Sequence, residues 1–504
     1  MSKHVPLNFV TNLLVFIITI LVNLFMTPFY IKTIGIDGLG VLRLALMLPV
    51  YINLIMLIIS GTVSRFLTID IQRKEFKNAI ITFNTSFFSI SSLLLITLPI
   101  IIYLSINITS FLEIPQRYTM DATYLFLGVF LSSQIIIFSA LFLIPAYAEN
   151  RIDVQNYIKI IVLCLQTSLI FLMFTFLSVK ISYIGYAYFI AAFIALIISL
   201  FIWKKFAPFL NLSISAFRFE VFKKIASMGS WLLINQVGSI LFLSIDLLII
   251  NYFFGSNETG KYSIVLQWSI LLRGLATMVV GVITPLILIS YAKKNYSDII
   301  IISEYSVKFM GIFIAIPIGL ILGFAQPLLT LWVGSEFISL IPLLWVLILH
   351  LLINLAVLPL FSIYTAYNKV KIPGIVSLVF GIVNLILAIT LSVGFEYGIY
   401  GVAFAGAIVL TLKNSIFIPI YAAKILDLNI FTFFIFLKNG IFVFISTYLI
   451  SQIYYITGIT TWSELMIYIF ISLLCILIFI WKVVLNNNDK YILKNKIKKK
   501  ESYV

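Results

Sequence analysis

The sequence predicts an all-α polytopic membrane protein, and three observations support this fold class. The 504-residue chain is 62% hydrophobic and only 10% charged, whereas soluble globular domains are about half apolar and about one quarter charged. Its mean hydropathy is +1.17. Apolar runs of about twenty residues recur along the chain, each long enough to cross a hydrocarbon core about 30 Å thick. The alternating segments of about ten residues that are typical of a transmembrane β-barrel are absent.

The apolar runs divide into about fourteen predicted spans. The first run is too long for a signal-peptide core and has no small-residue cleavage pattern after it, so it is read as the first span. In chain order the spans are 9–31, 41–63, 79–104, 121–147, 157–178, 182–203, 226–253, 262–290, 305–331, 338–366, 373–394, 398–423, 432–455 and 462–485.

The loops between these spans alternate in charge. About 26 of the 33 lysines and arginines lie on one side, together with both chain ends. Cytoplasmic loops of membrane proteins are rich in lysine and arginine, so this side is predicted to be cytoplasmic. We therefore expect a multi-pass protein of the bacterial inner membrane with both termini in the cytoplasm. The net charge of +15 follows from this topology and from a basic tail near anionic lipid, and it does not indicate a nucleic-acid partner.

An internal repeat relates the two halves of the chain. Residues 33–74 and 253–294 align without a gap at an offset of 220 residues. The matched positions are Gly35 with Gly255, Gly40 with Gly260, Gly61 with Gly281, and Arg73–Lys74 with Lys293–Lys294. Further along, "NRI" at 150 resembles "NKV" at 368. An offset of six helices keeps both copies in the same orientation, which predicts two parallel six-helix lobes related by an axis along the membrane normal.

The predicted organisation follows from this repeat. It comprises an N-terminal six-helix lobe at 1–203, a cytoplasmic linker at 204–225, a C-terminal six-helix lobe at 226–425, two appended transmembrane helices at 426–485 and a basic cytoplasmic tail at 486–504.

Polar and ionisable residues inside the spans are the candidates for a functional site. Each costs several kcal/mol there unless it faces water or a partner. The candidates for substrate binding are Arg273, Arg43, Asn53, Asp246 and Lys413. The repeat places Asn53 at the position equivalent to Arg273, so both lobes put a polar group at one depth. Arginine stays charged and grips phosphate in a bidentate way, which favours an anionic substrate.

Each candidate also has a structural interpretation. Arg43 could snorkel to the outer headgroups, and Asp246 could form an ion pair with Arg273 that joins two spans. His350 is better explained as a hydrogen-bonded packing residue than as a proton relay. Because carboxylates are scarce inside the spans, any coupling to H⁺ or Na⁺ is expected to pass through Asp246.

Motifs of enzymes and metal sites are absent from the sequence. Cys164 and Cys475 both lie in apolar runs and imply neither a disulfide framework nor a metal site. No GxxxxGK[ST] phosphate-binding loop is present, which excludes ATP hydrolysis by that route. A membrane acyltransferase would need a histidine near an acid, but His350 stands alone and His4 is terminal. We therefore expect no catalytic residue, metal or cofactor.

Five stretches carry a family resemblance. They are "TPFYIKTIGIDGLGVLRLALMLPVYINLI", "SIDLLIINYFFGSNETGKYSIVLQW", "ITPLILISYAKKN", "LLTLWVGSEF" and "AYNKVKIPGIVSLVFGIVNLILA". With these stretches, most of residues 8–425 resembles the polysaccharide-export branch of the multidrug/oligosaccharidyl-lipid/polysaccharide flippase superfamily, which includes the O-antigen flippases. The resemblance implies a V-shaped pair of six-helix lobes that moves undecaprenyl-diphosphate-linked sugars to the outer leaflet.

The resemblance also bears on the site residues and partners. It implies that intramembrane arginines handle the anionic part of the substrate. The family's aspartate in the seventh span is often followed by arginine, whereas Leu247 follows Asp246 here, so a fixed charge pair is not carried over at that point. The expected partners are the lipid-linked glycan and membrane lipid. Coupling to H⁺ or Na⁺ and contact with a polymerase or ligase of the glycan pathway stay open.

Two alternative functions remain beside the flippase. A cation-coupled multidrug antiporter of the same superfamily would bind apolar cations. A membrane-embedded glycan-modifying enzyme is the second alternative, although a glycan polymerase would be expected to carry a large outer loop, and none is predicted.

Cysteine labelling tests the predicted topology. In a chain whose two natural cysteines have been replaced, a cysteine at position 110 or 458 should react with a membrane-impermeant maleimide added outside the cell, because both positions lie in predicted outer loops. A cysteine at position 296 lies in a predicted cytoplasmic loop and should react only after the membrane has been opened. The reverse labelling pattern would contradict the topology.

Overall fold

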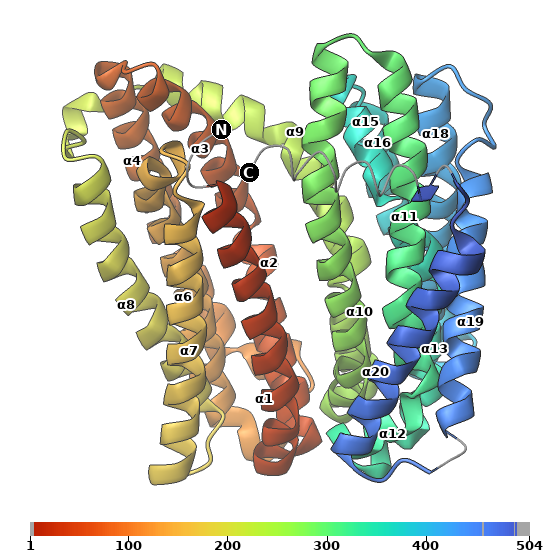
Figure 1. Cartoon of the computed structure of the whole chain (residues 1–504). Coiled ribbons are helices and arrows are strands. Elements are labelled where there is room, and N and C mark those ends of the chain that lie inside the picture. Colours follow the sequence, from red (N-terminus) through yellow and green to blue (C-terminus); the bar gives the residue numbers. More distant parts are fainter. Residues whose placement is uncertain (1–4, 456–457, 488, 491–504) are drawn as a thin grey trace. The chain divides into compact units, whose positions relative to one another are not determined.

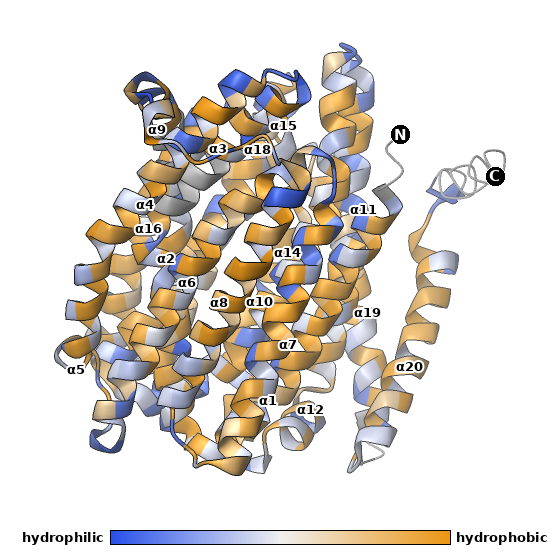
Figure 2. Cartoon of the chain, turned by 90° about the vertical axis from the view of Figure 1, so that its left-hand side faces the viewer, coloured by the Kyte–Doolittle hydropathy of each residue, from blue (hydrophilic) through white to orange (hydrophobic). Residues whose placement is uncertain are grey.

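The computed structural model describes residues 5–455, 458–487 and 489–490. Within these ranges the chain is helical and contains no strand, so the all-α prediction is confirmed. Twelve candidate membrane-spanning helices lie in the described part of the chain, which makes this a multi-pass membrane protein. Figure 2 shows hydrophobic residues along the lengths of the helices and hydrophilic residues gathered near their ends.

The chain divides into two compact units, Met1–Ser263 and Ile264–Val504. The first unit holds α1 (Val5–Met47), α2 (Pro49–Ile52), α3 (Leu54–Gln72), α4 (Phe76–Ile106), α5 (Ile108–Phe111), η1 (Gln116–Tyr118), α6 (Thr119–Ala148), α7 (Ile152–Phe176), α8 (Ser182–Phe206), η2 (Ile214–Ala216), α9 (Phe219–Leu243) and the start of α10 (Asp246–Ala292). Figure 1 shows α6, α7 and α8 of this unit as long helices, and both α6 and α7 pack against α8.

The second unit begins inside α10 and is built from shorter pieces. It holds α11 (Tyr296–Gly323), α12 (Ala325–Trp332), η3 (Ser335–Leu340), α13 (Ile341–Leu349), α14 (Leu351–Ala356), η4 (Leu358–Leu360), α15 (Phe361–Ala366), α16 (Lys371–Ile389), η5 (Thr390–Gly394), α17 (Gly398–Leu410), η6 (Thr411–Phe417), α18 (Ile418–Ile425), η7 (Phe434–Phe436), α19 (Leu437–Tyr455), α20 (Trp462–Phe479) and η8 (Ile480–Val484). The segments η5, η6 and η8 are π-helical.

Two of the candidate spans are too long for one crossing. Pro6–Ile52 has 47 residues and Gln236–Ala292 has 57, whereas about 20 residues suffice. Inside them, Gly35 has φ 69° and ψ 176°, and Gly255 has φ 82° and ψ 179°. Only glycine adopts this conformation readily, so each long helix is interrupted there. The count of about fourteen spans stays a prediction.

The backbone repeats its unusual conformations at the positions that the sequence repeat predicts. Lys74 and Lys294 have φ of 60° and 55°, and Asn150 and Asn368 have φ of 61° and 54°. Each is the left-handed residue of a Schellman motif, in which the following N–H returns to the carbonyl five residues earlier. Positive φ is uncommon outside glycine, so these matched pairs support the repeat. The lobe and linker limits given above stay predictions.

Two equivalent glycines allow a close backbone crossing inside the first unit. A Cβ atom on Gly40 would lie 2.1 Å from the carbonyl oxygen of Ser256, and a Cβ atom on Gly260 would lie 2.2 Å from that of Ile36. Ile36 and Ser256 are themselves equivalent positions of the repeat. The two copies therefore meet in a reciprocal contact about a local two-fold axis.

A hydrogen bond joins another equivalent pair at this crossing. Asn257 Nδ2 donates to Asp37 Oδ1 at 2.9 Å, and the two positions lie 220 residues apart. The other oxygen of the same carboxylate pairs with Arg117 Nη2, also at 2.9 Å. At this crossing, the Asp37 carboxylate thus accepts a hydrogen bond from the Asn257 amide and pairs with the Arg117 guanidinium.

The end of the predicted appended pair of helices is tied to the second unit by a buried ion pair. Lys308 Nζ of α11 lies 2.5 Å from Asp489 Oδ2, and the two side chains are 8% and 0% exposed. Asp489 also accepts a hydrogen bond from the backbone N–H of Asn486 at 2.9 Å. This pair holds the chain that follows α20 against α11.

Adding a methyl group at the glycine crossing is expected to destabilise the protein. Gly40→Ala and Gly260→Ala should each lower stability by about 1–3 kcal/mol, because the new Cβ atom meets backbone that cannot move aside. The measurement is the midpoint of thermal unfolding of the purified protein in detergent. Gly281→Ala is the matched control, since nothing lies within 4 Å of its Cβ position. Equal midpoints for all three variants would contradict the close crossing.

Candidate functional site

Two of the predicted cations lie in the second unit. Arg273 lies on α10 and Lys413 lies on η6, and the two are near enough for their charges to repel. The Arg273 charge also acts on His350, at the junction of α13 and α14. Arg273 Nε donates a hydrogen bond of 3.3 Å to Ser269 Oγ one turn earlier. The second unit therefore contains two cations and a nearby imidazole, which we call the cationic cluster and define as Arg273, Lys413 and His350.

A π-helical segment presents Lys413 to this cluster. The backbone of Thr411–Phe417 is π-helical, and such segments occur frequently at functional sites. Three consecutive polar residues of this segment are buried: Lys413, Asn414 and Ser415. Lys413 Nζ lies 5.9 Å from the centre of the Phe361 ring, which is within the range of a cation–π interaction.

A buried chain of hydrogen bonds connects α14 to the same π-helical segment. Asn354 Nδ2 and His350 Nδ1 are 2.6 Å apart, and Ser415 Oγ donates to Asn354 Oδ1 at 2.7 Å. Asn354 is fully buried. These hydrogen bonds fix the position of η6, and with it the position of Lys413, against α14. The prediction that His350 is a hydrogen-bonded packing residue agrees with this geometry.

Asn354 and Ser415 are not among the candidates predicted from the sequence. Their signal in the sequence is weak, because single asparagine and serine residues inside apolar helices are common bonds between helices. The spacing of four between His350 and Asn354 places both on one helical face and could have singled out the pair. A further buried acceptor, Asn414 Oδ1, has no hydrogen-bond partner within the described residues.

An apolar cavity of about 570 Å³ adjoins the cluster. It lies between α13, α14, α17 and α19, and His350 and Thr411 contribute its few polar atoms. Its walls include Trp345, Phe404 and Phe444. The second unit therefore places a hydrophobic cavity beside the imidazole of His350, the member of the cluster that contributes to its lining.

The other candidates lie in the first unit. Asp246 Oδ2 accepts a hydrogen bond of 2.9 Å from Tyr262 Oη. Tyr51 lies close enough to Asp246 for an electrostatic interaction with its carboxylate. Asn53 Nδ2 donates to Ser133 Oγ at 2.7 Å. Asp246 and Arg273 belong to different units, so their predicted ion pair stays a prediction.

Arg43 points into the helix bundle of the first unit. Its Nη2 donates to Thr27 Oγ1 at 2.9 Å, and Thr27 is fully buried. Tyr30 and Tyr188 lie close enough for electrostatic interaction with the guanidinium. This arrangement favours an internal polar role over snorkelling to the headgroups.

No group of three or more histidine, cysteine or acidic side chains suited to a metal ion occurs in the residues that the structure describes. The free cysteines Cys164 and Cys475 are both exposed. In the second unit, the polar side chains of the site are cations, an imidazole, amides and hydroxyls, which can attract and hydrogen-bond an anion.

The architecture defines a multi-pass membrane protein with the fold of MOP-superfamily transporters. Solved structures with this fold include the lipid II flippase MurJ in an inward closed conformation, with a TM-score of 0.64, 16% identity and coverage of 94% of this chain and 98% of that one. A multidrug resistance MATE family transporter of the MOP superfamily, in an inward-facing conformation, has a TM-score of 0.61 and 16% identity, and the match covers 81% of this chain and 95% of that one. The MATE multidrug transporter DinF-BH has a TM-score of 0.61 and 18% identity, and the match covers 86% of this chain and 97% of that one.

A sequence relative shows the family. The chain is 33% identical over 425 residues to the uncharacterized membrane protein EpsK of Bacillus subtilis (strain 168), and the match covers 83% of each chain. The chain belongs to the same family as that protein. No family model matches it.

Removing the buried lysine is expected to stabilise the protein. Lys413→Met should raise stability by about 2 kcal/mol, because a charged lysine deep in a span is costly and this one is repelled by Arg273. The measurement is again the midpoint of thermal unfolding in detergent. Lys438→Met, at the exposed start of α19, is the matched control and should leave the midpoint unchanged. A fall in the midpoint of the Lys413 variant would mean that this lysine holds the bundle together.

Proposed function

We propose that the protein is a flippase for an undecaprenyl-diphosphate-linked oligosaccharide, the repeat unit of O-antigen or another surface polysaccharide. It moves this substrate across the bacterial inner membrane by alternating access, with both chain termini in the cytoplasm. The observation that carries the proposal is that Arg273 and the buried Lys413 lie near enough for their charges to repel, with His350 of the same cluster lining an apolar cavity of about 570 Å³.

The physical argument concerns the charge of the diphosphate. An anion inside the membrane is costly unless charged or polar groups accompany it. Two cations held close together repel each other, and a diphosphate beside them relieves this repulsion through charge-assisted hydrogen bonds. Binding relieves a pre-existing strain, so the cluster favours an anionic substrate over a neutral or cationic one.

The apolar cavity supports an amphiphilic substrate. A free sugar or sugar nucleotide has no apolar part that could pack against the hydrophobic wall next to the cationic cluster. A lipid-linked diphosphate has an apolar chain attached to the anion and can contact both. The solved structures with this fold include a flippase for lipid II, which is itself a lipid-linked glycan. The assignment to surface polysaccharide rests on the resemblance of the five quoted stretches.

We propose roles for the remaining candidates on the same basis. Arg43 offers a second cation to the diphosphate in the first unit, and Asn53 offers an amide at the position equivalent to Arg273. Asp246, held by Tyr262, is the carboxylate through which any coupling to H⁺ or Na⁺ passes. Full ion-driven transport by an Asp246→Asn variant would exclude that role.

A cation-coupled multidrug antiporter is the second candidate. The observation in its favour is Asp246, a buried carboxylate with the tyrosines Tyr262 and Tyr51 nearby, because aromatic and acidic side chains together suit an apolar cation. Counterflow in proteoliposomes separates the two functions. A flippase exchanges labelled polyprenyl-diphosphate-linked sugar, whereas an antiporter exchanges a cationic dye.

Substitution of Arg273 tests the flippase directly. Arg273→Ala should abolish display of surface glycan while leaving the amount of protein in the membrane unchanged, because the fixed positive charge for the diphosphate is lost. Arg273→Lys should keep partial display, since the charge survives but the bidentate grip does not. Arg73→Ala, in an exposed loop, is the matched control and should display glycan normally.

The structural interpretation of Arg273 leads to a different outcome. If Arg273 serves mainly to neutralise Asp246, Arg273→Ala should lower protein abundance, and the double variant with Asp246→Asn should restore both abundance and glycan display. A double variant that displays glycan would show that Arg273 is an architectural charge and would contradict the proposed role.

A further inference from the structure

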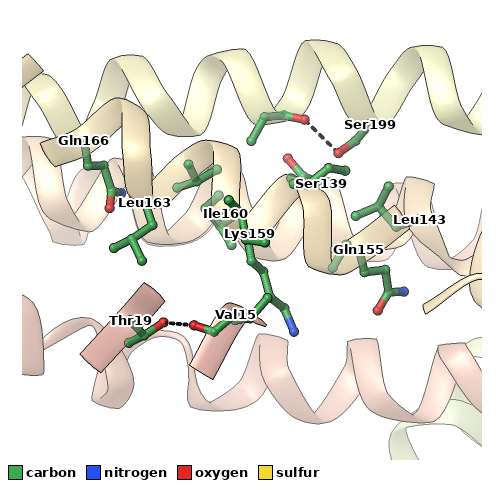
Figure 3. A pocket seen from close by; sticks show the side chains of 15 residues that line it. Val15, Thr19, Ser139, Leu143, Gln155, Lys159, Ile160, Leu163, Gln166 and Ser199 are labelled. Carbon is green, nitrogen blue, oxygen red and sulfur yellow. Dashed lines mark hydrogen bonds between the residues drawn. The ribbon is translucent and has the colours of Figure 1, made fainter. Parts of the chain in front are cut away.

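A second cavity, of about 400 Å³, lies inside the first unit between α1, α6, α7 and α8 (Figure 3). Its volume falls in the range of about 300–1,000 Å³ that ligand pockets occupy. None of the fifteen residues that line it is aromatic, although 15% of the chain is. Aliphatic side chains such as Ile136, Leu143 and Leu163 form its walls. A flat ring would be bound best by aromatic side chains that stack on it, and this cavity has none. Its aliphatic walls suit a flexible hydrocarbon chain better.

The hydroxyl groups in this cavity need no ligand. Thr19 donates to the carbonyl oxygen of Val15 at 2.7 Å, and Ser139 donates to that of Ile135 at the same distance. Ser199 likewise donates to its own helix. Because these donors are occupied, the walls between them remain effectively apolar.

The polar edge of the cavity belongs to α7 alone. Gln155, Lys159 and Gln166 line the cavity, and their spacings of four and seven residues place them on one face of the helix. None of the three forms a hydrogen bond or ion pair with another described residue, and no acidic residue lines the cavity. In Figure 3 the Lys159 side chain extends from α7 towards α1. The cavity therefore has apolar walls and an uncompensated positive charge on one edge.

The depth of Lys159 fits the level of lipid phosphates. α7 begins at Ile152, directly after Arg151 on the side where the lysines and arginines gather. Lys159 follows seven residues later, about 10 Å along the helix axis. A lysine at that depth can extend its ammonium group back towards the headgroups. Phosphate groups of the leaflet on this basic side lie within its reach.

We propose that this cavity binds an anionic phospholipid from the leaflet on the basic side of the membrane. One acyl chain fills the space between α1, α6, α7 and α8, and the phosphate contacts Lys159 with Gln155 as a hydrogen-bond donor. Inside a bilayer, the molecules available to fill the apolar part of this cavity are lipids. The single positive charge selects an anionic headgroup over a zwitterionic one. This inference concerns a site separate from the cationic cluster and does not rest on the proposed transport function.

Lipid analysis of the purified protein tests this site. The protein is extracted in a mild detergent without added lipid, and the bound phospholipids are identified and counted per chain by mass spectrometry. Lys159→Gln should reduce bound phosphatidylglycerol about fivefold, the factor expected for one lysine at a membrane surface. Ala140→Phe, which places a ring in the cavity without changing charge, should displace the lipid as well. Lys205→Gln, at the exposed end of α8 outside the cavity, removes the same charge and should retain it.

Several outcomes would overturn the proposal. Wild-type lipid content in either Lys159→Gln or Ala140→Phe would do so, and the second variant decides the matter if the first fails to fold. An equal loss in Lys205→Gln would show that only the overall charge matters. Recovery from the wild-type protein of zwitterionic lipids, free fatty acid or polyprenyl phosphates in place of phosphatidylglycerol would show that a different ligand occupies the cavity.

Discussion

Satisfying backbone hydrogen bonds without water is the constraint on which the rest of the structure depends. In a hydrocarbon core each unpaired N–H or C=O costs several kcal/mol, so the chain crosses it as helices. The helix ends then decide where the chain can turn. Schellman motifs at Lys74, Asn150, Lys294 and Asn368 return two donors to carbonyls that would otherwise be orphaned. Short loops built this way leave little room for a folded domain at these four turns, so the candidate functional residues are sought among the helices.

The same constraint explains why polar side chains are concentrated in a few places. A buried cation is tolerated only where the surrounding helices offer polar or aromatic groups, as Phe361 does for Lys413. The chain from His350 through Asn354 to Ser415 is a scaffold of neutral hydrogen bonds that holds a charged residue in place. The wider, π-helical backbone of η6 accommodates Lys413 in this position while its backbone hydrogen bonds continue. Stability and the proposed binding of an anion thus make opposite demands on the same few residues.

Much of the fold could be predicted from the sequence because hydropathy and helix length are local properties. The repeat was visible because Gly35 and Gly255 occupy a conformation that other residues avoid. The candidate site was predictable only in part. Arg273 and Lys413 stood out individually, since charges in apolar runs are rare, but their meeting depends on how distant helices pack. The π-helical turn and the role of Asn354 depend on the same packing, which no short motif encodes.

The hydrogen bond between Asp37 and Asn257 has a consequence for how alike the two copies of the repeat can be. If the two copies were identical, a residue close to the two-fold axis would face its own copy, so an aspartate would meet an aspartate and the two carboxylates would repel. In one polypeptide the facing positions need not be identical, and here the second copy carries the amide that pairs with the carboxylate of the first. A single chain thus permits a complementary pair that exact two-fold symmetry forbids. Asn257→Asp would place two carboxylates face to face and create the conflict of a fully symmetric pair.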